Sequence, residues 1–177
     1  GVSVLAGEGT GMERDYDFAT KVYGADLPDA AAIGKSAGEK AVKRLNPRKV
    51  STAQVPVIFD PRVANSIVGH LSSAINGSAV ARGTTFLKDA MGEAVFAPGI
   101  TIVDDPHRRR GLRTEPIAGD GVASKSRNVI EDGRLTTWFL DCRSARQLKL
   151  TTTGHAARGT SSPPSPSASN LYMEAGK

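Results

Sequence analysis

Two adjacent carboxylates, Asp104 and Asp105, are the side chains of this sequence best suited to acid/base chemistry. Paired carboxylates can divide the roles of acid and base between them. Asp105 also precedes Pro106, and an aspartate before a proline is an ordinary way to end a strand. We favour the strand-ending role and keep acid/base chemistry as the alternative.

The single cysteine, Cys142, can act as a nucleophile only if a base activates it. No histidine lies near it in the sequence, and none is related to it by a known spacing. We therefore favour a buried thiol. The three histidines, His70, His107 and His155, are far apart and match no zinc-binding spacing, so we interpret each as structural or exposed.

The net charge of +5 raises the possibility of a nucleic-acid-binding regulator. The basic residues are dispersed, except for a cluster formed by Arg108, Arg109, Arg110 and Arg113. Hardly any aromatic residue lies beside this cluster to stack on a base. A solvated loop is therefore the favoured interpretation, and nucleic-acid binding is a weaker alternative.

A length of 177 residues allows one well-buried core, or one domain with part of another. A lone cysteine forms no internal disulfide, so nothing requires an oxidising compartment, and we expect a cytoplasmic protein. No apolar run approaches the roughly 18 residues that a membrane-spanning helix needs. The sequence opens at Gly1 within a strand-like run, from which we expect a fragment of a longer protein.

The element that organises the rest is a predicted helix over residues 60–76. Asp60 can cap it, and Pro61 suits its first position, because the N–H that proline lacks is unpaired there. Apolar residues recur at spacings of three and four, so we expect other structure to enclose the helix. A strand over residues 55–59 leads into it, and Gly77 ends it. With one histidine, His70, and no acidic residue beyond its cap, this helix alone cannot build a metal site.

The segment over residues 46–54 is polar and contains a proline, so we predict a domain boundary there, which divides the chain into two parts. The first part contains a long helix over residues 28–46, which Pro47 stops. Its Gly34 and Gly38 suggest close packing against another backbone, because glycine lowers helix stability by about 1 kcal/mol relative to alanine. Strands are expected over residues 2–6 and 12–23.

The later part of the chain is predicted to hold a hairpin around Asp132 and Gly133, which readily adopt a tight turn. Its strands cover residues 128–130 and 135–140. Another strand covers residues 100–103, and a short helix capped by Asp141 follows the hairpin. Two segments are predicted to lack elements: a loop over residues 77–92 and a linker rich in serine and proline over residues 160–169.

Several ordered segments together resemble the TldD/PmbA family, whose members are often labelled modulators of DNA gyrase. The series runs in order across nearly the whole chain. The matching segments are GEGTGMERDYDF (7–18), IGKSAGEKAVKRLNPRKV (33–50), VPVIFDP (55–61), RGTTFLKDAMGEAV (82–95), ITIVDDP (100–106), VIEDG (129–133), SARQL (144–148) and NLYMEAGK (170–177).

The proteolytic branch of that family carries HExxxH on the helix that corresponds to residues 60–76. There two histidines bind zinc, and the glutamate can act as general base. The corresponding positions here are Val68, Gly69 and Ser73, none of which can do that chemistry. The chain therefore resembles the PmbA branch, also called TldE, which shares the fold but lacks the metal motif.

The resemblance implies that residues 1–50 end a central α/β domain and that residues 51–177 begin a β-rich C-terminal domain. It also implies a non-catalytic subunit, with no catalytic, metal-binding or cofactor-binding residue of its own. It implies pairing with a TldD-like peptidase that supplies zinc and degrades peptides, cuts the leader from modified microcin precursors and removes an antitoxin. A homodimer is the alternative assembly. The bacterial cytoplasm is the implied location, and the gyrase label does not imply DNA binding.

Peptide or partner contacts are assigned on this basis to Asp104, Asp105, His155 and Arg158. The chain departs from its branch near two of them, because GHAAR (154–158) stands where relatives have Gly-Asn-Ala-Arg. An independent hydrolase remains an alternative, and Asp104, Asp105, Cys142 and His155 are its candidate residues.

The expected fold class is α+β. We expect a mainly antiparallel, curled sheet around the buried helix 60–76, and an additional helix, 28–46, from the preceding domain.

Overall fold

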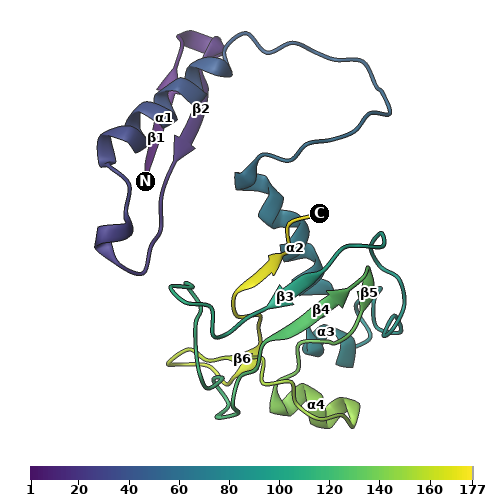
Figure 1. The fold of residues 1–177 in the computed structure, drawn as a ribbon. Coiled ribbons are helices and arrows are strands. Elements are labelled where there is room, and N and C mark those ends of the chain that lie inside the picture. The colour runs from purple at the N-terminus through teal and green to yellow at the C-terminus, as the bar shows by residue number, and fades with distance from the viewer. Residues whose placement is uncertain (177) are drawn as a thin grey trace. The chain divides into compact units, whose positions relative to one another are not determined.

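The computed structural model describes residues 1–176. The chain divides into two compact units, Gly1–Val57 and Ile58–Lys177, and each is described by itself. Figure 1 shows their elements.

The first unit is a two-stranded antiparallel sheet with one helix on it. Strands β1 and β2 pair in register from Val2 opposite Asp17 to Ala6 opposite Glu13. Helix α1 begins after Asp29 and buries Ala37 and Ala41. The elements are β1 (Val2–Ala6), η1 (Gly9–Gly11), β2 (Glu13–Asp17), η2 (Gly24–Asp26) and α1 (Ala30–Lys43).

Ion pairs connect α1 to β2. Lys40 Nζ lies 2.8 Å from Asp17 Oδ2, and Arg44 Nε lies 2.7 Å from Asp15 Oδ2. The hydrogen bond from Lys40 lowers the pKa of Asp17 from 3.8 to about 2. Among residues 1–176, nothing packs closely against Gly34 or Gly38, because a Cβ atom at either position would meet no atom outside its own helix backbone within 4 Å. Helix α1 is therefore held against the sheet by these ion pairs and by the buried Ala37 and Ala41, rather than by close contacts at its glycines.

The strand expected over residues 55–59 does not form. The segment carries no secondary structure, and its apolar side chains are exposed, Ile58 to 96%. Valine and isoleucine favour an extended backbone, but a strand also needs a hydrogen-bonding neighbour. In the described part of the chain this segment has no such neighbour.

The second unit combines helices with a four-stranded antiparallel sheet of order β5-β4-β3-β8. The α+β class with a mainly antiparallel sheet is thus confirmed. Figure 1 shows β8 at one edge of this sheet, beside α2. The helices are α2 (Pro61–Ala74), α3 (Gly77–Ala81) and α4 (Cys142–Leu148), and the strands are β3 (Ile102–Asp104), β4 (Arg127–Glu131), β5 (Arg134–Leu135), β6 (Ala156–Ala157), β7 (Ser165–Pro166) and β8 (Leu171–Met173).

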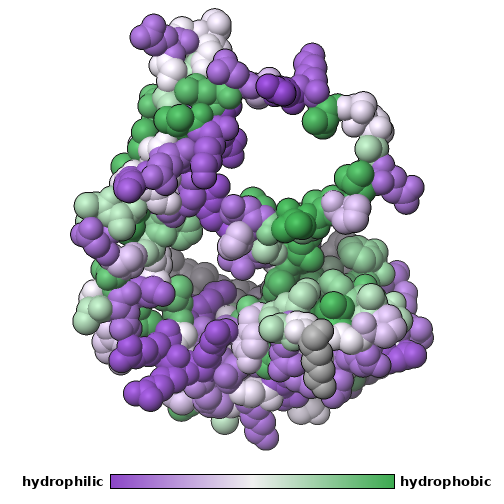
Figure 2. All heavy atoms as spheres, turned by 45° about the horizontal axis from the view of Figure 1, so that its top comes forward, coloured by the Kyte–Doolittle hydropathy of each residue, from purple (hydrophilic) through white to green (hydrophobic). Residues whose placement is uncertain are grey.

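The hydrophobic core lies between α2 and the sheet, and only the C-terminal half of α2 contributes to it. The helix was expected to be largely enclosed by other structure, and in its first half Val63 is 51% exposed. Figure 2 shows apolar side chains on the exposed surface where the chain enters this helix. The core residues are Leu71, Ala74, Ile75, Leu87, Ile102, Val129, Ile130, Leu135 and Phe139.

The hairpin prediction is confirmed at its turn. Asp132 and Gly133 have φ angles of 46° and 77°, as the predicted tight turn requires, and they join β4 to β5. The second strand is shorter than expected, because β5 ends at Leu135. Beyond it, Phe139 N donates to Ile75 O and so connects the chain to the end of α2 instead.

Two segments predicted to lack elements contain them. Helix α3 begins within the predicted loop 77–92, and Asn76 caps it by accepting a hydrogen bond from Ser78 N. Gly77 does not end α2 in a left-handed turn. It packs so closely that a Cβ atom there would lie 2.6 Å from Phe139 O. The predicted linker 160–169 contains β7, which pairs with β6.

Candidate functional site

Helix α2 carries Val68, Gly69 and Ser73, which the resemblance described above places at the positions of the metal motif. Asp60 caps it by accepting a hydrogen bond from Arg62 N at 2.9 Å. Val68 is half-buried, whereas Gly69 is exposed and has open space beside it. The Ser73 hydroxyl donates to Gly69 O at 3.1 Å. These positions therefore present the methyl groups of Val68 and the hydroxyl of Ser73, which already donates a hydrogen bond within the helix.

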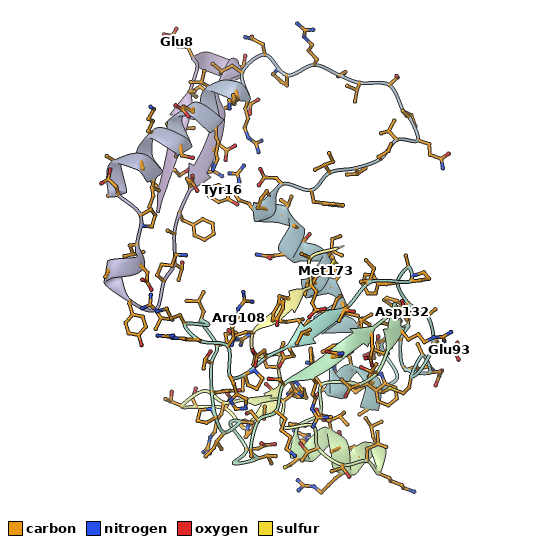
Figure 3. The ribbon with its side chains drawn as sticks, in the orientation of Figure 1. Glu8, Tyr16, Glu93, Arg108, Asp132 and Met173 are labelled. Carbon is orange, nitrogen blue, oxygen red and sulfur yellow. The ribbon has the colours of Figure 1, made fainter. Side chains whose placement is uncertain are left out.

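An open groove of about 510 Å³ runs between α2 and β8, and we call it the α2–β8 groove. Val68 belongs to its wall, and Figure 3 labels Met173 at its β8 side. None of its lining side chains is a carboxylate, histidine or cysteine, so the groove offers apolar contact rather than acid/base chemistry. The lining residues are Phe59, Ala64, Asn65, Ile67, Val68, Leu171, Tyr172 and Met173.

A second cavity, of about 310 Å³, also borders α2. His70 is the one ionisable side chain that lines it, and it is exposed. The remaining lining residues are apolar: Ile67, Leu71, Phe86, Leu87, Val95 and Phe96. A single histidine among apolar side chains lacks the partner that orients a general base.

The donor atoms present do not fit a zinc ion. A zinc site with three protein ligands needs histidine, cysteine or carboxylate groups in convergent positions. Among residues 1–176, no group of three or more such side chains lies close enough together to hold a metal. His70 is the only ligand-type side chain on α2 after its cap.

Asp104 and His155, selected separately from the sequence, form a buried pair. His155 Nε2 lies 3.1 Å from Asp104 Oδ2, and the two side chains are 4% and 1% exposed. Ser169 donates to the same carboxylate from its N–H at 2.8 Å and from its hydroxyl at 2.6 Å. The other ring nitrogen of His155 lies 2.8 Å from the Thr153 hydroxyl. We call these four residues the Asp104 network.

The Asp104 network contains the side-chain types of a catalytic triad, but they are buried and therefore not accessible to a substrate. A nucleophile must reach a substrate atom, and here every polar group is bonded to another protein group. The His155 ring also lies against Phe139 of the core, with ring centroids 4.5 Å apart. The network therefore joins the end of β3 to the segments that precede β6 and β8.

Asp105 faces a different environment from Asp104. It accepts hydrogen bonds from the Ser126 hydroxyl at 2.5 Å and from His107 N at 3.0 Å. The Ser126 bond lowers the pKa of Asp105 below its usual value. The two adjacent carboxylates thus have separate partners, and Asp105 stabilises the turn that follows β3.

Cys142 lies at the start of α4, away from any histidine contact. Its backbone N–H donates to Asp120 Oδ2 at 2.9 Å. A side-chain hydrogen bond to Asp120 also raises the pKa of the Cys142 thiol, because the carboxylate stabilises the protonated form. A thiol with a raised pKa is a poor nucleophile at neutral pH.

The exposed basic residues have structural contacts of their own. The Arg108 guanidinium lies 4.5 Å from the centre of the Tyr172 ring. Arg113 N donates to the Asn170 side chain at 3.0 Å. The basic loop is therefore anchored to the segment around β8. Arg158 is exposed, and a Cβ atom at Gly119 would meet its Cβ at 2.9 Å, so its backbone is close-packed while its charge faces solvent.

The sequence analysis missed Ser169 and Thr153. Both lie in polar runs without a distinguishing motif. Ser169 lies 65 positions from its partner Asp104, whereas Thr153 lies two positions from its partner His155. A serine or threonine hydroxyl can bond to almost any polar group, so residue type alone did not single them out.

The fold and the α2 sequence together define a class of protein. Residues 52–177 match the family described as PmbA/TldA metallopeptidase C-terminal domain, and the chain belongs to this family. The resemblance drawn from the sequence is thereby confirmed.

Particular relatives refine this assignment. The chain is 41% identical to Metalloprotease PmbA of Escherichia coli O157:H7 over 153 residues, which cover 86% of this chain and 34% of the relative. It is also similar to a crystal structure from Bacteroides thetaiotaomicron named as a modulator of DNA gyrase, with 25% identity and a TM-score of 0.85 over 98% of this chain and 37% of the other. TldE from Thermococcus kodakarensis matches with 25% identity and a TM-score of 0.79, over 98% of this chain and 39% of that chain.

The chain spans about a third of the length of the curated relatives that it matches. Within residues 1–176, none of the helices is both long and apolar enough to cross a membrane.

Proposed function

We propose that this chain is part of a PmbA/TldE-like subunit that does not cleave peptides itself. In this proposal the subunit pairs with a TldD-like zinc metallopeptidase in peptide proteolysis and peptide maturation. The partner supplies the zinc and the general base, and the cytoplasm is the proposed location.

The observation that carries the proposal is the chemistry of α2. Val68, Gly69 and Ser73 occupy the positions of the motif, and they provide no imidazole and no carboxylate. A zinc peptidase needs metal ligands and a general base at one place. A subunit without them contributes to proteolysis through binding or through its partner's site.

The relatives support a peptidase context. The E. coli relative is named a metalloprotease, and the Thermococcus kodakarensis relative is named TldE. The name TldE is that of the branch without the metal motif, which suits pairing with a TldD-like chain. A homodimer is the alternative assembly.

A second candidate is a subunit with its own metallopeptidase activity. The name of the E. coli relative, Metalloprotease PmbA, is the observation that favours it. The earlier candidates for an independent hydrolase are less favoured, because Asp104 and His155 are buried together while Asp105 and Cys142 have other partners. Nucleic-acid binding is also disfavoured, because the guanidinium groups of Arg108 and Arg113 contact Tyr172 and the Ser167 hydroxyl of the same chain.

The test is peptide hydrolysis by the full-length protein, alone and mixed with the TldD-like relative from the same source. We expect zinc-dependent cleavage only in the mixture, and its loss when a chelator removes the metal. The matched controls are two variants: glutamine at the motif glutamate of the TldD-like chain, and Gly69→Gln in this chain. The first should abolish activity and the second should leave it unchanged. Chelator-sensitive cleavage by this chain alone would overturn the proposal.

A further inference from the structure

A further cavity, of about 290 Å³, lies beside the start of α4, and we call it the α4 cavity. Three segments of the second unit build it: a loop before β4, helix α4 itself and the loop between β6 and β7. A cavity of this size suits a small ligand. Pro163 and Pro164 belong to its wall, and the fixed φ angle of proline makes that part of the wall rigid. The other lining residues are Asp120, Asp141, Cys142, Arg143 and Arg146.

One carboxylate of the α4 cavity has an incomplete set of hydrogen bonds. Asp120 Oδ2 accepts from Cys142 N at 2.9 Å, whereas Asp120 Oδ1 is buried and has no hydrogen-bond partner among residues 1–176. A buried acceptor without a donor is unfavourable, and proteins usually supply one. Asp141 differs, because its carboxylate accepts from the backbone N–H and the hydroxyl of Ser144 at 2.7 and 2.5 Å. Asp120 is therefore the acid that lacks a donor.

Two arginines of the same cavity lack an anionic partner. Arg143 and Arg146 are three positions apart on α4, so their side chains are neighbours on one side of the helix. Both are exposed, and neither guanidinium has a hydrogen-bond or ion-pair partner within the described residues. A guanidinium suits a carboxylate, because its parallel N–H groups can bind both oxygens. The cavity thus combines an acid that lacks a donor with two bases that lack an acceptor.

We propose that the α4 cavity binds a small zwitterion, a molecule that carries one ammonium group and one carboxylate group. The ammonium group donates to Asp120 Oδ1, and the carboxylate accepts from Arg143 and Arg146. Two acids and two arginines line the cavity, so their formal charges cancel, which disfavours a ligand with charge of only one sign. A free amino acid with a small apolar side chain belongs to this class, since its side chain can lie against the two prolines. The inference does not depend on the proposed function.

The experiment is isothermal titration calorimetry of the full-length protein with valine and with γ-aminobutyrate, two zwitterions that hold their charges at a short and a long separation. Saturable binding of at least one of them is expected. The matched controls are two analogues of the zwitterion that binds: its N-acetyl form, which lacks the ammonium group, and its amide, which lacks the carboxylate. Each should bind at least about tenfold more weakly, because each loses one set of charge-assisted hydrogen bonds.

Substitutions locate the two halves of the site. Asp120→Asn removes the acid, and the pair Arg143→Gln with Arg146→Gln removes the bases, so each change should weaken binding about tenfold. The control is Lys125→Gln, which removes the same charge from an exposed residue outside the cavity. It should change the affinity less than about twofold, because exposed charges at a distance are screened.

The reactivity of Cys142 reports whether the ligand lies in the cavity. The residue lines the α4 cavity, so a saturating concentration of the zwitterion should slow alkylation of the thiol by iodoacetamide at least about threefold. This measurement uses the unaltered protein, so a folding defect in a variant does not affect it.

Four results would each overturn the inference. They are a failure of both zwitterions to bind, equal binding of a singly charged analogue and its parent, an equal loss in Lys125→Gln and in the arginine variant, and an alkylation rate that bound ligand leaves unchanged. None of these measurements involves peptide cleavage or a TldD-like chain, so failure here is distinguishable from failure of the proposed function.

Discussion

The Asp104 network and the α2–β8 groove lie on neighbouring strands, and they differ in the properties that matter for catalysis. Asp104 pairs in register with Leu171, which lines the groove. The network holds the carboxylate, imidazole and hydroxyls of a hydrolytic site, but buries them. The groove is open, but its walls are apolar. In this chain the side chains capable of chemistry stabilise the fold, and the accessible surface is suited to binding.

The largest effect is expected when the network is broken at its centre. Asp104→Ala removes the acceptor shared by His155 and by two donors of Ser169. Breaking a buried, hydrogen-bonded pair in this way should lower the free energy of unfolding by about 3–5 kcal/mol. Denaturation with urea measures this change. Asp105→Ala is the control, and an equal loss for both variants would contradict the structural role of the network.

Two glycine-to-alanine substitutions, one at a closely packed position and one on the open face of α2, should change the stability of the protein in opposite directions. Gly77→Ala places a Cβ atom 2.6 Å from Phe139 O, so it should destabilise the protein by about 1–3 kcal/mol. Gly69→Ala on the open face of α2 meets no atom within 4 Å and should stabilise it by about 0.5–1 kcal/mol. Thermal unfolding measures both changes. A destabilising Gly69→Ala would mean that this face of α2 is not open.

A smaller effect, measured as a reaction rate, is expected at the Cys142 thiol. Because Asp120 raises the pKa of this thiol, Asp120→Asn should lower that pKa and speed alkylation several-fold at mildly alkaline pH. Iodoacetamide labelling followed by mass spectrometry measures the rate over a series of pH values. If the rate of the variant matches that of the unaltered protein at every pH, Asp120 does not control the thiol.

The smallest effect is expected at Asp105. Its folded pKa is lowered by Ser126, so the bond adds stability above the unfolded pKa of 3.8, and that stability is lost as the pH falls through the lowered folded pKa. Ser126→Ala should therefore lower the melting temperature slightly at about pH 6, and the difference should shrink as the pH falls below 3.8. A difference that persists in acid would show that the hydroxyl acts by some other means.

The elements that were predictable from the sequence depend on local interactions. Asp29, Asp60 and Asp141 each precede a helix, and Asp60 and Asp141 accept hydrogen bonds from its first turn. Asp132 and Gly133 specify their turn by backbone preference alone. Caps and tight turns involve residues a few positions apart, so composition and spacing are enough to find them.

The predictions that failed depend on remote partners. Residues 55–59 have strand-forming side chains but no neighbouring strand, whereas Ser165 and Pro166 belong to a strand because residues 156–157 lie beside them. The same limit applied to the site. Asp104 and His155 were selected as candidates, but their direct contact spans 51 positions and no spacing rule predicts it. The roles of Asp104, Asp105, His155 and Arg158 in peptide or partner contact stay predictions.

The Asp104 network can form only late in the synthesis of the chain. Ser169 is 65 positions beyond Asp104, so the ribosome completes β3 well before the residue that donates two hydrogen bonds to its carboxylate. Until then Asp104 must stay hydrated, because burying it without partners is unfavourable. Contacts of such long range also form slowly. The end of β3 is therefore among the last parts of the sheet to close, and a nascent chain that stops short of residue 169 would keep this carboxylate in water.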